Sequence, residues 1–401
     1  MKTFANLFLI LFFADGFLSL LDELSSLIAP VVPLTLFRIQ VANTVLLLAI
    51  ALYLCLGIDR RLPKKLFLPL IAFLFVVPLA AWIFPVLGGS KLYAIVMSAI
   101  QVGVPPLLIA RYRDKKDPGV TLPPWRFEGP FFSGKNTLLF AGVNVVVLPV
   151  ALATLALFLT DAWALQNTAG FIRVAPHGLY MTERLYRRGN QTIRLTGMVH
   201  VGEKQYYEDV ARLPVNGRTI VLAEGVTDRK TVLHNRFDYR EVASFLGLAP
   251  QETKLFAGRL IDEKALDAPP GPATGSPDIL MADLDLSLFR PETMLFLNQV
   301  GKHLRENPSF VDAALALNRW AERNVTPEMY EVIMDDILTR RNQVLLGYLD
   351  RALKRYDAVV VPWGALHMKG IEEGVLKRGF VLKEERKRLS MDFKRMLTSQ
   401  R

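Results

Sequence analysis

Two stretches decide the fold of the carboxyl-terminal part of this chain: QTIRLTGMVH at residues 191–200 and DAVVVPWGALH at residues 357–367. Each joins an apolar run, typical of a buried strand, to the pattern Gly-x-x-His, at Gly197 to His200 and at Gly364 to His367. The chain has only five histidines and 26 glycines among 401 residues, so two such matches are more than chance predicts. A strand ending in Gly-x-x-His sets an imidazole at the rim of a sheet, where glycine allows close backbone approach or a positive φ. Two such rims brought together would form a paired-histidine site.

The region around these motifs alternates between strand-like and helix-like runs. The apolar strand Thr219-Ile-Val-Leu-Ala ends in Glu224, and Phe380 to Leu382 reads as a last short strand. Helices are predicted at Tyr239 to Leu246, Ser309 to Arg323 and Pro327 to Arg355. This alternation predicts an α/β domain with a mixed or largely parallel sheet. Such sheets hold their sites at the carboxyl ends of strands, which is where His200, Glu224 and His367 fall.

The first 160 residues are too apolar for a soluble domain. Four uncharged runs of 18 to 22 residues are long enough to cross a hydrocarbon core of about 30 Å: Val41 to Ile58, Leu66 to Leu87, Leu92 to Ala110 and Leu138 to Leu159. An additional run, Phe4 to Leu21, would be the first of five spans in chain order; it is interrupted by Asp15 and is either a span or a cleavable signal sequence, and we favour the span. The sequence therefore predicts a transmembrane helical region at residues 1–160 and a separate α/β domain at residues 161–401.

Basic residues predict how the spans are oriented in a cytoplasmic (inner) membrane. Ten lysines and arginines lie in the loops after the second and fourth predicted spans, whereas the opposite loops hold little more than Arg38 and Lys91. The positive-inside rule places the basic loops in the cytoplasm, so the fifth span leaves the α/β domain outside, in an extracytoplasmic or periplasmic position.

Composition excludes several other classes of function. The formal charge of +10 is explained by basic residues that flank membrane spans, so we expect the lipid bilayer as a partner and no nucleic acid. The single cysteine, Cys55, excludes a disulfide framework and a zinc site built from cysteines.

The ordered motifs of the outer domain resemble the TraB/PrgY/TIKI family. They are GMVHVG at residues 197–202, the strand-end Glu224, Arg341-Asn342 in a helix, and GALHMKG at residues 364–370. The resemblance covers about residues 190–383 and implies a fold similar to the erythromycin-esterase and ChaN-like proteins. Animal TIKI members look like metal-dependent proteases tethered outside the membrane, and bacterial members are associated with limiting a peptide pheromone. This chain departs from the TIKI pattern because its spans precede the domain.

The resemblance selects His200, Glu224, Arg341 and His367 as functional residues. Two imidazoles and a carboxylate, His200, His367 and Glu224, suit a divalent metal such as Zn²⁺, Mn²⁺ or Co²⁺, with a bound water that attacks the carbonyl of a peptide or protein substrate. A second mechanism needs no metal: His200 deprotonates the water and Glu224 orients it, as in an esterase. A third reading is a non-enzymatic membrane protein that binds and sequesters a peptide.

Two further expectations concern charged neighbours of these residues. Arg341 either braces Glu224 or stabilises an oxyanion, and Arg340 is expected at the surface. Asp283 and Asp285 share one face of a predicted strand, and we expect them to be solvated acids rather than ligands of a second cation.

Overall fold

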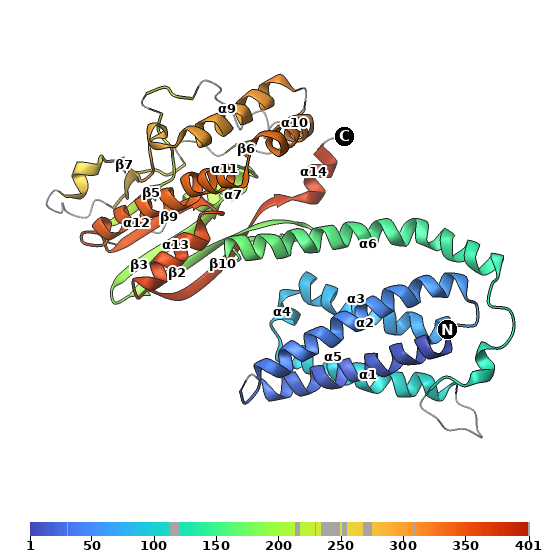
Figure 1. The fold of residues 1–401 in the computed structure, drawn as a ribbon. Helices are drawn as coiled ribbons and strands as arrows, with labels where there is room; N and C mark the ends of the chain where they lie inside the picture. The colour runs from blue at the N-terminus through green and yellow to red at the C-terminus, as the bar shows by residue number, and fades with distance from the viewer. Residues whose placement is uncertain are drawn as a thin grey trace. The chain divides into compact units, whose positions relative to one another are not determined.

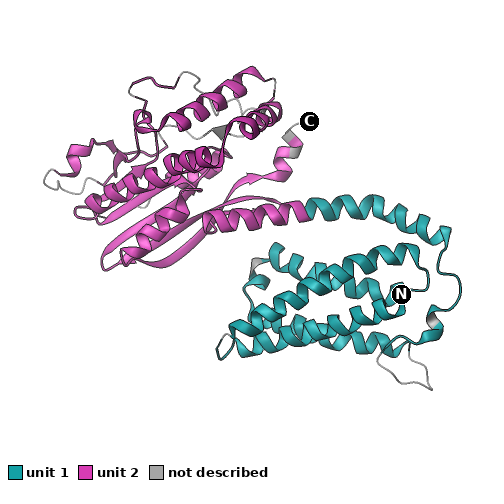
Figure 2. Ribbon diagram, in the orientation of Figure 1, with its two compact units in different colours: residues 1–154 teal, residues 155–401 magenta. Residues whose placement is uncertain are grey.

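The computed structural model describes residues 1–29, 31–112, 121–212, 217–228, 230–233, 249–250, 255–267, 275–307 and 309–399. The chain divides into two compact units, Met1–Thr154 and Leu155–Arg401 (Figure 2). The division falls inside one long helix, close to the predicted boundary at residue 160. The predicted helix at Tyr239 to Leu246 lies outside the described residues.

The first unit is helical (Figure 1). Its elements are α1 (Lys2–Ser25), α2 (Val32–Ile58), α3 (Lys64–Ile83), α4 (Pro85–Gly88), α5 (Lys91–Ala110), the 3₁₀ turn η1 (Pro124–Phe127) and α6 (Gly134–Thr168). Among the described residues, five helices are long and apolar enough to cross a membrane: α1, α2, α3, α5 and α6. Each predicted run falls on one of them, except that Leu66 to Leu87 is divided between α3 and α4, and the run with Asp15 is a full helix.

Aromatic and aliphatic side chains form the core of this unit. Phe8 and Phe12 of α1 are buried against Phe67 of α3 and Phe73, with ring centroids about 6 Å apart. Many other large apolar side chains on the long helices of this unit are exposed, among them Leu107 of α5 and Leu138 of α6. An apolar helix surface of this extent is unfavourable in water and suits a lipid environment.

The second unit is built on a mixed eight-stranded sheet, counted over the described residues. Its strands run in the order β1-β2-β3-β9-β5-β8-β7, and β10 pairs with β2. The strands β3, β9, β5, β8 and β7 are parallel, and β1, β2 and β10 are antiparallel additions. The bounds are β1 (Ile172–Ala175), β2 (Gly178–Arg188), β3 (Gln191–Met198), β5 (Thr219–Ala223), β7 (Arg259–Leu260), β8 (Asp278–Met281), β9 (Ala358–Gly364) and β10 (Val381–Asp392); β4 (Val201–Gly202) and β6 (Ala249–Pro250) pair separately.

The sequence explains the central strands and the first hairpin. Ile220, Val221 and Leu222 of β5 are all buried, as expected of a parallel strand covered on both faces. Strands β2 and β3 are joined by a two-residue turn, where Gly189 has a φ of 56° that glycine adopts without strain. Strand β10 is much longer than the predicted Phe380 to Leu382. It pairs with β2 and is exposed along most of its length, so its charged residues give no apolar pattern from which a strand could be predicted.

Helices accompany this sheet. They are α7 (Lys204–Ala211), η2 (Glu263–Leu266), η3 (Leu286–Leu288), α9 (Pro291–Glu306), α10 (Phe310–Asn324), α11 (Pro327–Met334), the π-helical segment η4 (Asp335–Arg340), α12 (Arg341–Ala352), α13 (Met368–Lys377) and α14 (Phe393–Ser399). Apolar residues of α12 and α13, including Leu345, Leu349 and Ile371, share one core with the strands.

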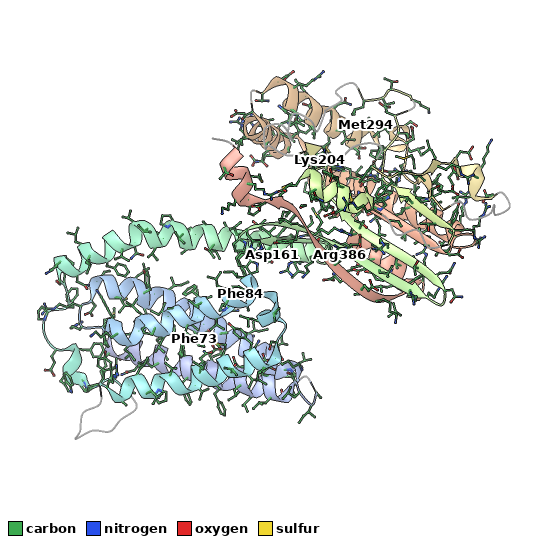
Figure 3. The ribbon with its side chains drawn as sticks, turned by 180° about the vertical axis from the view of Figure 1, so that it is seen from behind. Phe73, Phe84, Asp161, Lys204, Met294 and Arg386 are labelled. Carbon is green, nitrogen blue, oxygen red and sulfur yellow. The ribbon has the colours of Figure 1, made fainter. Side chains whose placement is uncertain are left out.

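The last turns of α6 belong to the second unit and are fastened to its sheet. The buried Asp161 accepts hydrogen bonds from Arg173 Nε at 3.0 Å, Arg173 Nη2 at 2.8 Å and the backbone N–H of Val174 at 2.7 Å. Figure 3 labels Asp161 where α6 reaches the strands. This ion pair fixes the end of the predicted fifth span to strand β1.

Candidate functional site

The candidate site lies where four parallel strands end. Gly197 pairs with Trp363 and Met198 with Gly364, so the two Gly-x-x-His motifs end neighbouring strands at the same level. In the same sheet, Ala223 of β5 pairs with Met281 of β8. Each strand is followed within three residues by a candidate side chain: His200 after β3, His367 after β9, Glu224 after β5 and Asp283 after β8. The carboxyl edge of the sheet therefore gathers two imidazoles and two acids.

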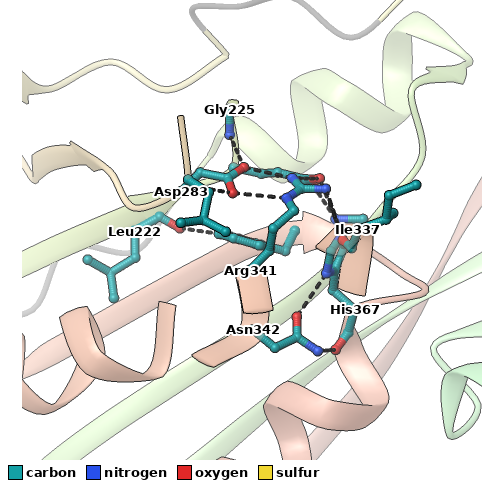
Figure 4. Close-up of polar contacts among 11 residues, drawn as sticks. Leu222, Gly225, Asp283, Ile337, Arg341, Asn342 and His367 are labelled. Atoms are coloured by element: carbon teal, nitrogen blue, oxygen red, sulfur yellow. Dashed lines mark hydrogen bonds and ion pairs between the residues drawn. The ribbon is translucent and has the colours of Figure 1, made fainter. Parts of the chain in front are cut away.

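Arg341, the first residue of α12, joins three of these side chains (Figure 4). Its Nε donates to Oδ1 of Asp283 at 2.9 Å, and its Nη2 donates to Oδ2 of the same residue at 2.6 Å. Nη2 also donates to Oε1 of Glu224 at 2.8 Å, and Nη1 lies 3.1 Å from Nε2 of His367 and 3.5 Å from the carbonyl oxygen of Ile337. All five N–H groups of the guanidinium thus have an acceptor.

This saturation decides what Arg341 can do in the folded protein. The residue is 8% exposed, so its charge needs partners. Burial lowers the pKa of Arg341, but the hydrogen bonds and charges of Asp283 and Glu224 outweigh it and leave the pKa raised. With no donor left for an oxyanion, the geometry favours the bracing role over oxyanion stabilisation.

The helix that carries Arg341 is interrupted just before it. The sequence predicts one α-helix from Pro327 to Arg355, whereas the structure inserts the π-helical segment η4 between α11 and α12. Single π-helical turns are frequent at functional sites, because the wider turn redirects the side chains that follow.

A second buried carboxylate anchors this segment. Asp336, fully buried in η4, accepts hydrogen bonds from the backbone N–H and Nε of Arg290, from Thr293 Oγ1 and from Arg340 Nη1. Burial raises the pKa of Asp336, but these hydrogen bonds outweigh it and lower the pKa to about 2. Arg340, expected at the surface, has 36% of its side chain exposed there and pairs with Asp336 at 2.7 Å.

His367 is held in one tautomer by its neighbours. Asn342 accepts from Nδ1 through Oδ1 at 2.8 Å, and its Nδ2 donates to the carbonyl oxygen of His367 at 3.3 Å. Because Arg341 can only donate, Nε2 must be the accepting nitrogen and Nδ1 carries the proton. Burial and the charge of Arg341 lower the pKa of His367 to about 4, against the opposing charges of Glu224 and Asp283. His367 is therefore a neutral imidazole at pH 7.

Glu224 and His200 complete the site. Both residues are half-buried. Glu224 Oε2 accepts from the backbone N–H of Gly364 at 2.5 Å, which ties the end of β5 to the second Gly-x-x-His motif. The charge of a protonated His200 lowers the pKa of His367, so the two imidazoles are within electrostatic reach.

The glycines of the two motifs lie in tight space, and their backbone conformations do not themselves call for glycine. A Cβ on Gly364 would lie 3.3 Å from Oε2 of Glu224, and a Cβ on Gly197 would lie 3.3 Å from Phe171 Cβ. Neither glycine has a positive φ among the described residues. Gly370 of α13 leaves room for Asn342, because a Cβ there would meet Nδ2 at 2.6 Å.

The first motif is also held by two tyrosines of α7. Tyr206 Oη donates to the carbonyl oxygen of Gly197 and Tyr207 Oη donates to that of Val199, each at 2.8 Å. Burial raises the pKa of both hydroxyls, which keeps them protonated as donors. These bonds fix the turn that leads to His200.

A divalent metal does not fit these residues as they are arranged. Glu224 Oε1 and His367 Nε2, two atoms that would have to bind the ion, lie 3.7 Å apart and already contact Nη2 and Nη1 of Arg341, so a positive group stands against both of them. Among the described residues, no group of three or more His, Cys, Asp or Glu is arranged to hold a metal ion. The expected metal set of His200, Glu224 and His367 therefore remains a prediction for metal analysis.

Three contributors were missed at the level of sequence. The Asp283 side chain is fully buried, not solvated, because Arg341 binds both its oxygens and the backbone N–H groups of Gly225 and Leu284 donate to it. Asn342 orients His367, and the Trp363 ring packs edge-on against that imidazole with centroids 5.1 Å apart. The sequence could have predicted Asp283 as a site residue, because it follows the end of an apolar strand as Glu224 does.

Comparison with protein-family models, with curated proteins and with solved structures finds no match to this chain. The resemblance to the TraB/PrgY/TIKI family, and to a ChaN-like fold, therefore rests on the motifs themselves.

Proposed function

We propose that this protein is a membrane-anchored hydrolase whose second unit cleaves an ester or amide bond by a histidine-based mechanism. The observation that carries the proposal is the buried guanidinium of Arg341, which ties Glu224, Asp283 and a neutral His367 together at the carboxyl edge of the sheet. Burying these charged groups costs desolvation free energy, and apolar residues in the same place would stabilise the fold as well or better, so stability alone does not account for the cluster. Buried charge networks with shifted pKa values concentrate at active sites.

The roles follow from exposure and hydrogen bonding. His200 is half-buried, so it can meet water and act as the general base. Glu224, fixed by Arg341 and by Gly364 N–H, orients that water. His367 has its Nδ1 bound to Asn342 and its Nε2 turned to Arg341, so it is a positioning residue and not the base.

The charge of the site limits the substrate. Two acids face one guanidinium and a neutral His367, which gives the buried cluster a formal charge of −1. A net negative site repels phosphate groups and favours a neutral or cationic group next to the scissile bond. Peptides and uncharged esters meet this condition, in agreement with the substrate class that the family resemblance implies.

Membrane anchoring is the second part of the proposal. It is supported by the five apolar helices and by the large apolar side chains that they expose. The excess of basic residues in two loops supports an inner-membrane orientation with the second unit outside the cytoplasm.

One experiment separates the possible mechanisms. The full chain, purified in detergent, is tested on fluorogenic peptides and on nitrophenyl esters, with and without a chelator, and its metal content is measured. We expect hydrolysis that survives chelation and is lost in His200→Asn and Glu224→Gln. The matched control is His177→Gln, an exposed histidine of the same unit. Activity that needs stoichiometric metal would replace this mechanism by the metal-dependent peptidase, and peptide binding without turnover would support sequestration.

A further inference from the structure

A buried acid lies at the crossing of α1 and α5, away from the candidate site. The two helices approach closely beside it, because a Cβ added at Gly16 would lie 2.8 Å from Cγ and 3.1 Å from the carbonyl carbon of Gln101. Asp15, the neighbour of Gly16, is 14th of the 24 residues of α1 and is 5% exposed. It therefore lies near the middle of a helix long enough to cross a membrane.

Only one side chain in the described residues supports the Asp15 carboxyl group. Gln101 Nε2 donates to Oδ2 of Asp15 at 2.7 Å and also lies 3.2 Å from the carbonyl oxygen of Phe12. The other oxygen, Oδ1, is buried and has no hydrogen-bond partner among the described residues. One shared amide is far less than the two or three donors that usually hold a buried carboxylate.

Among the described residues, no lysine or arginine forms an ion pair with Asp15. On α2, Arg38 faces α1, but its guanidinium is paired with Asp22 at 3.3 Å and with Glu23 at 3.5 Å. On α5, Lys91 donates to the carbonyl oxygen of Ser26 at the helix start. An ionised carboxylate at mid-span would thus have no counter-charge in contact with it, and only the shared charge of Arg38 within electrostatic reach, which an apolar surrounding disfavours.

We propose that Asp15 is a proton-binding site, in which the proton resides on Oδ1 at neutral pH while Gln101 holds Oδ2. A neutral carboxyl group leaves one hydroxyl without a hydrogen-bond partner in the helix bundle, which costs less free energy than an unpaired charge in the same place. The proton can leave and return without a change of fold, because Gln101 Nε2 donates to Oδ2 in either state. The site also ties α1 to α5. This inference rests on the proposed membrane embedding of the helices.

The test uses dicyclohexylcarbodiimide, an apolar reagent that reacts with protonated carboxyl groups inside membranes. The full chain is reconstituted in phosphatidylcholine vesicles, labelled at several pH values and digested, and the modified residues are identified by mass spectrometry. We expect modification of Asp15 at neutral pH that declines at alkaline pH and is absent in Asp15→Asn. In Gln101→Leu, which removes the donor to Oδ2, labelling should persist to higher pH.

The matched control is Asp59→Asn, which removes another buried acid of the first unit, one that is paired with Arg61 at 2.7 Å, and should leave Asp15 labelling unchanged. An unlabelled Asp15 in the reconstituted chain would overturn the proposal. Protection of Asp15 by sodium ions would also overturn it, because a metal cation would then occupy the place of the proton. Release of the chain from membranes by alkaline carbonate would instead refute the membrane embedding, and hydrolysis by the second unit is measured separately.

Discussion

Arg341 Nη1 lies 3.1 Å from Nε2 of His367, and this contact sets the chemistry of the candidate site. A guanidinium is always protonated and can only donate, so Nε2 must supply a lone pair and the imidazole must be neutral. Asn342 completes the arrangement by binding Nδ1 at 2.8 Å. The two motif residues that the resemblance assigns to a metal site, Glu224 and His367, are thereby bridged by a positive side chain.

We expect Arg341→Ala to lower the free energy of unfolding of the second unit by about 3–5 kcal/mol, since it leaves the buried Asp283 without its partner. Arg341→Lys should restore little of this, because an ammonium cannot reproduce the planar fork that binds both oxygens of Asp283. Chemical denaturation of the full chain in detergent, followed by tryptophan fluorescence, measures both effects.

The adjacent Arg340→Lys is the control, because Arg290 also binds Asp336 and remains in place. The double variant Asp283→Ala/Arg341→Ala should lose less stability than the sum of the two single variants. Strict additivity, or equal losses for the two lysine variants, would show that Arg341 is not the brace.

The low pKa of His367 predicts a specific dependence of stability on pH. The folded pKa is about 4 against an unfolded value of 6.5, so between these values the unfolded chain binds more protons than the folded one. The contribution of His367 to stability is therefore complete above about pH 6.5 and is lost as the pH falls towards 4, by on the order of 3 kcal/mol.

This pH dependence is measured by denaturation at a series of pH values. It should be weaker in His367→Gln and unchanged in His177→Gln, whose side chain is exposed. A steep acid dependence that survives in His367→Gln would assign it to other groups.

Gly370→Ala is expected to abolish most of the hydrolytic activity while leaving the helix content of the protein nearly unchanged. A Cβ at this position would lie 2.6 Å from Nδ2 of Asn342, so the amide must move and His367 loses the partner of its Nδ1. Gly347→Ala in α12 is the matched control, because a Cβ there meets no atom within 4 Å. That control should be neutral or stabilising by about 0.5–1 kcal/mol. Turnover and circular dichroism are compared, and equal turnover in the two variants would contradict a role for Asn342.

The orientation of the second unit is tested by fusion. A reporter enzyme that is active only outside the cytoplasm, fused after Thr160, should be active, because ten basic residues lie in two loops on the opposite side. A fusion that works only with a cytoplasmic reporter would reverse the orientation and remove extracytoplasmic peptides from the candidate substrates.

Local sequence patterns determined most of the architecture. Uncharged runs of 18 to 22 residues can form little other than apolar helices, and each falls wholly or largely on one of the long helices of the first unit. The apolar runs before Glu224 and before both Gly-x-x-His motifs predict buried parallel strands, and β5, β3 and β9 confirm them. These features depend on residues that are close in sequence, which is why the pattern alone was enough.

The tertiary structure decided what those side chains contact. Arg341 is 58 residues from Asp283 and 117 from Glu224, and no local pattern specifies that one guanidinium serves both acids and His367. The same reason explains the wrong expectation for Asp283, whose burial depends on the approach of α12. Sequence determined which residues stand at the strand ends, and only the packing of α12 against the sheet decided that a buried cation joins them, because charge pairing in an interior depends on distance in space.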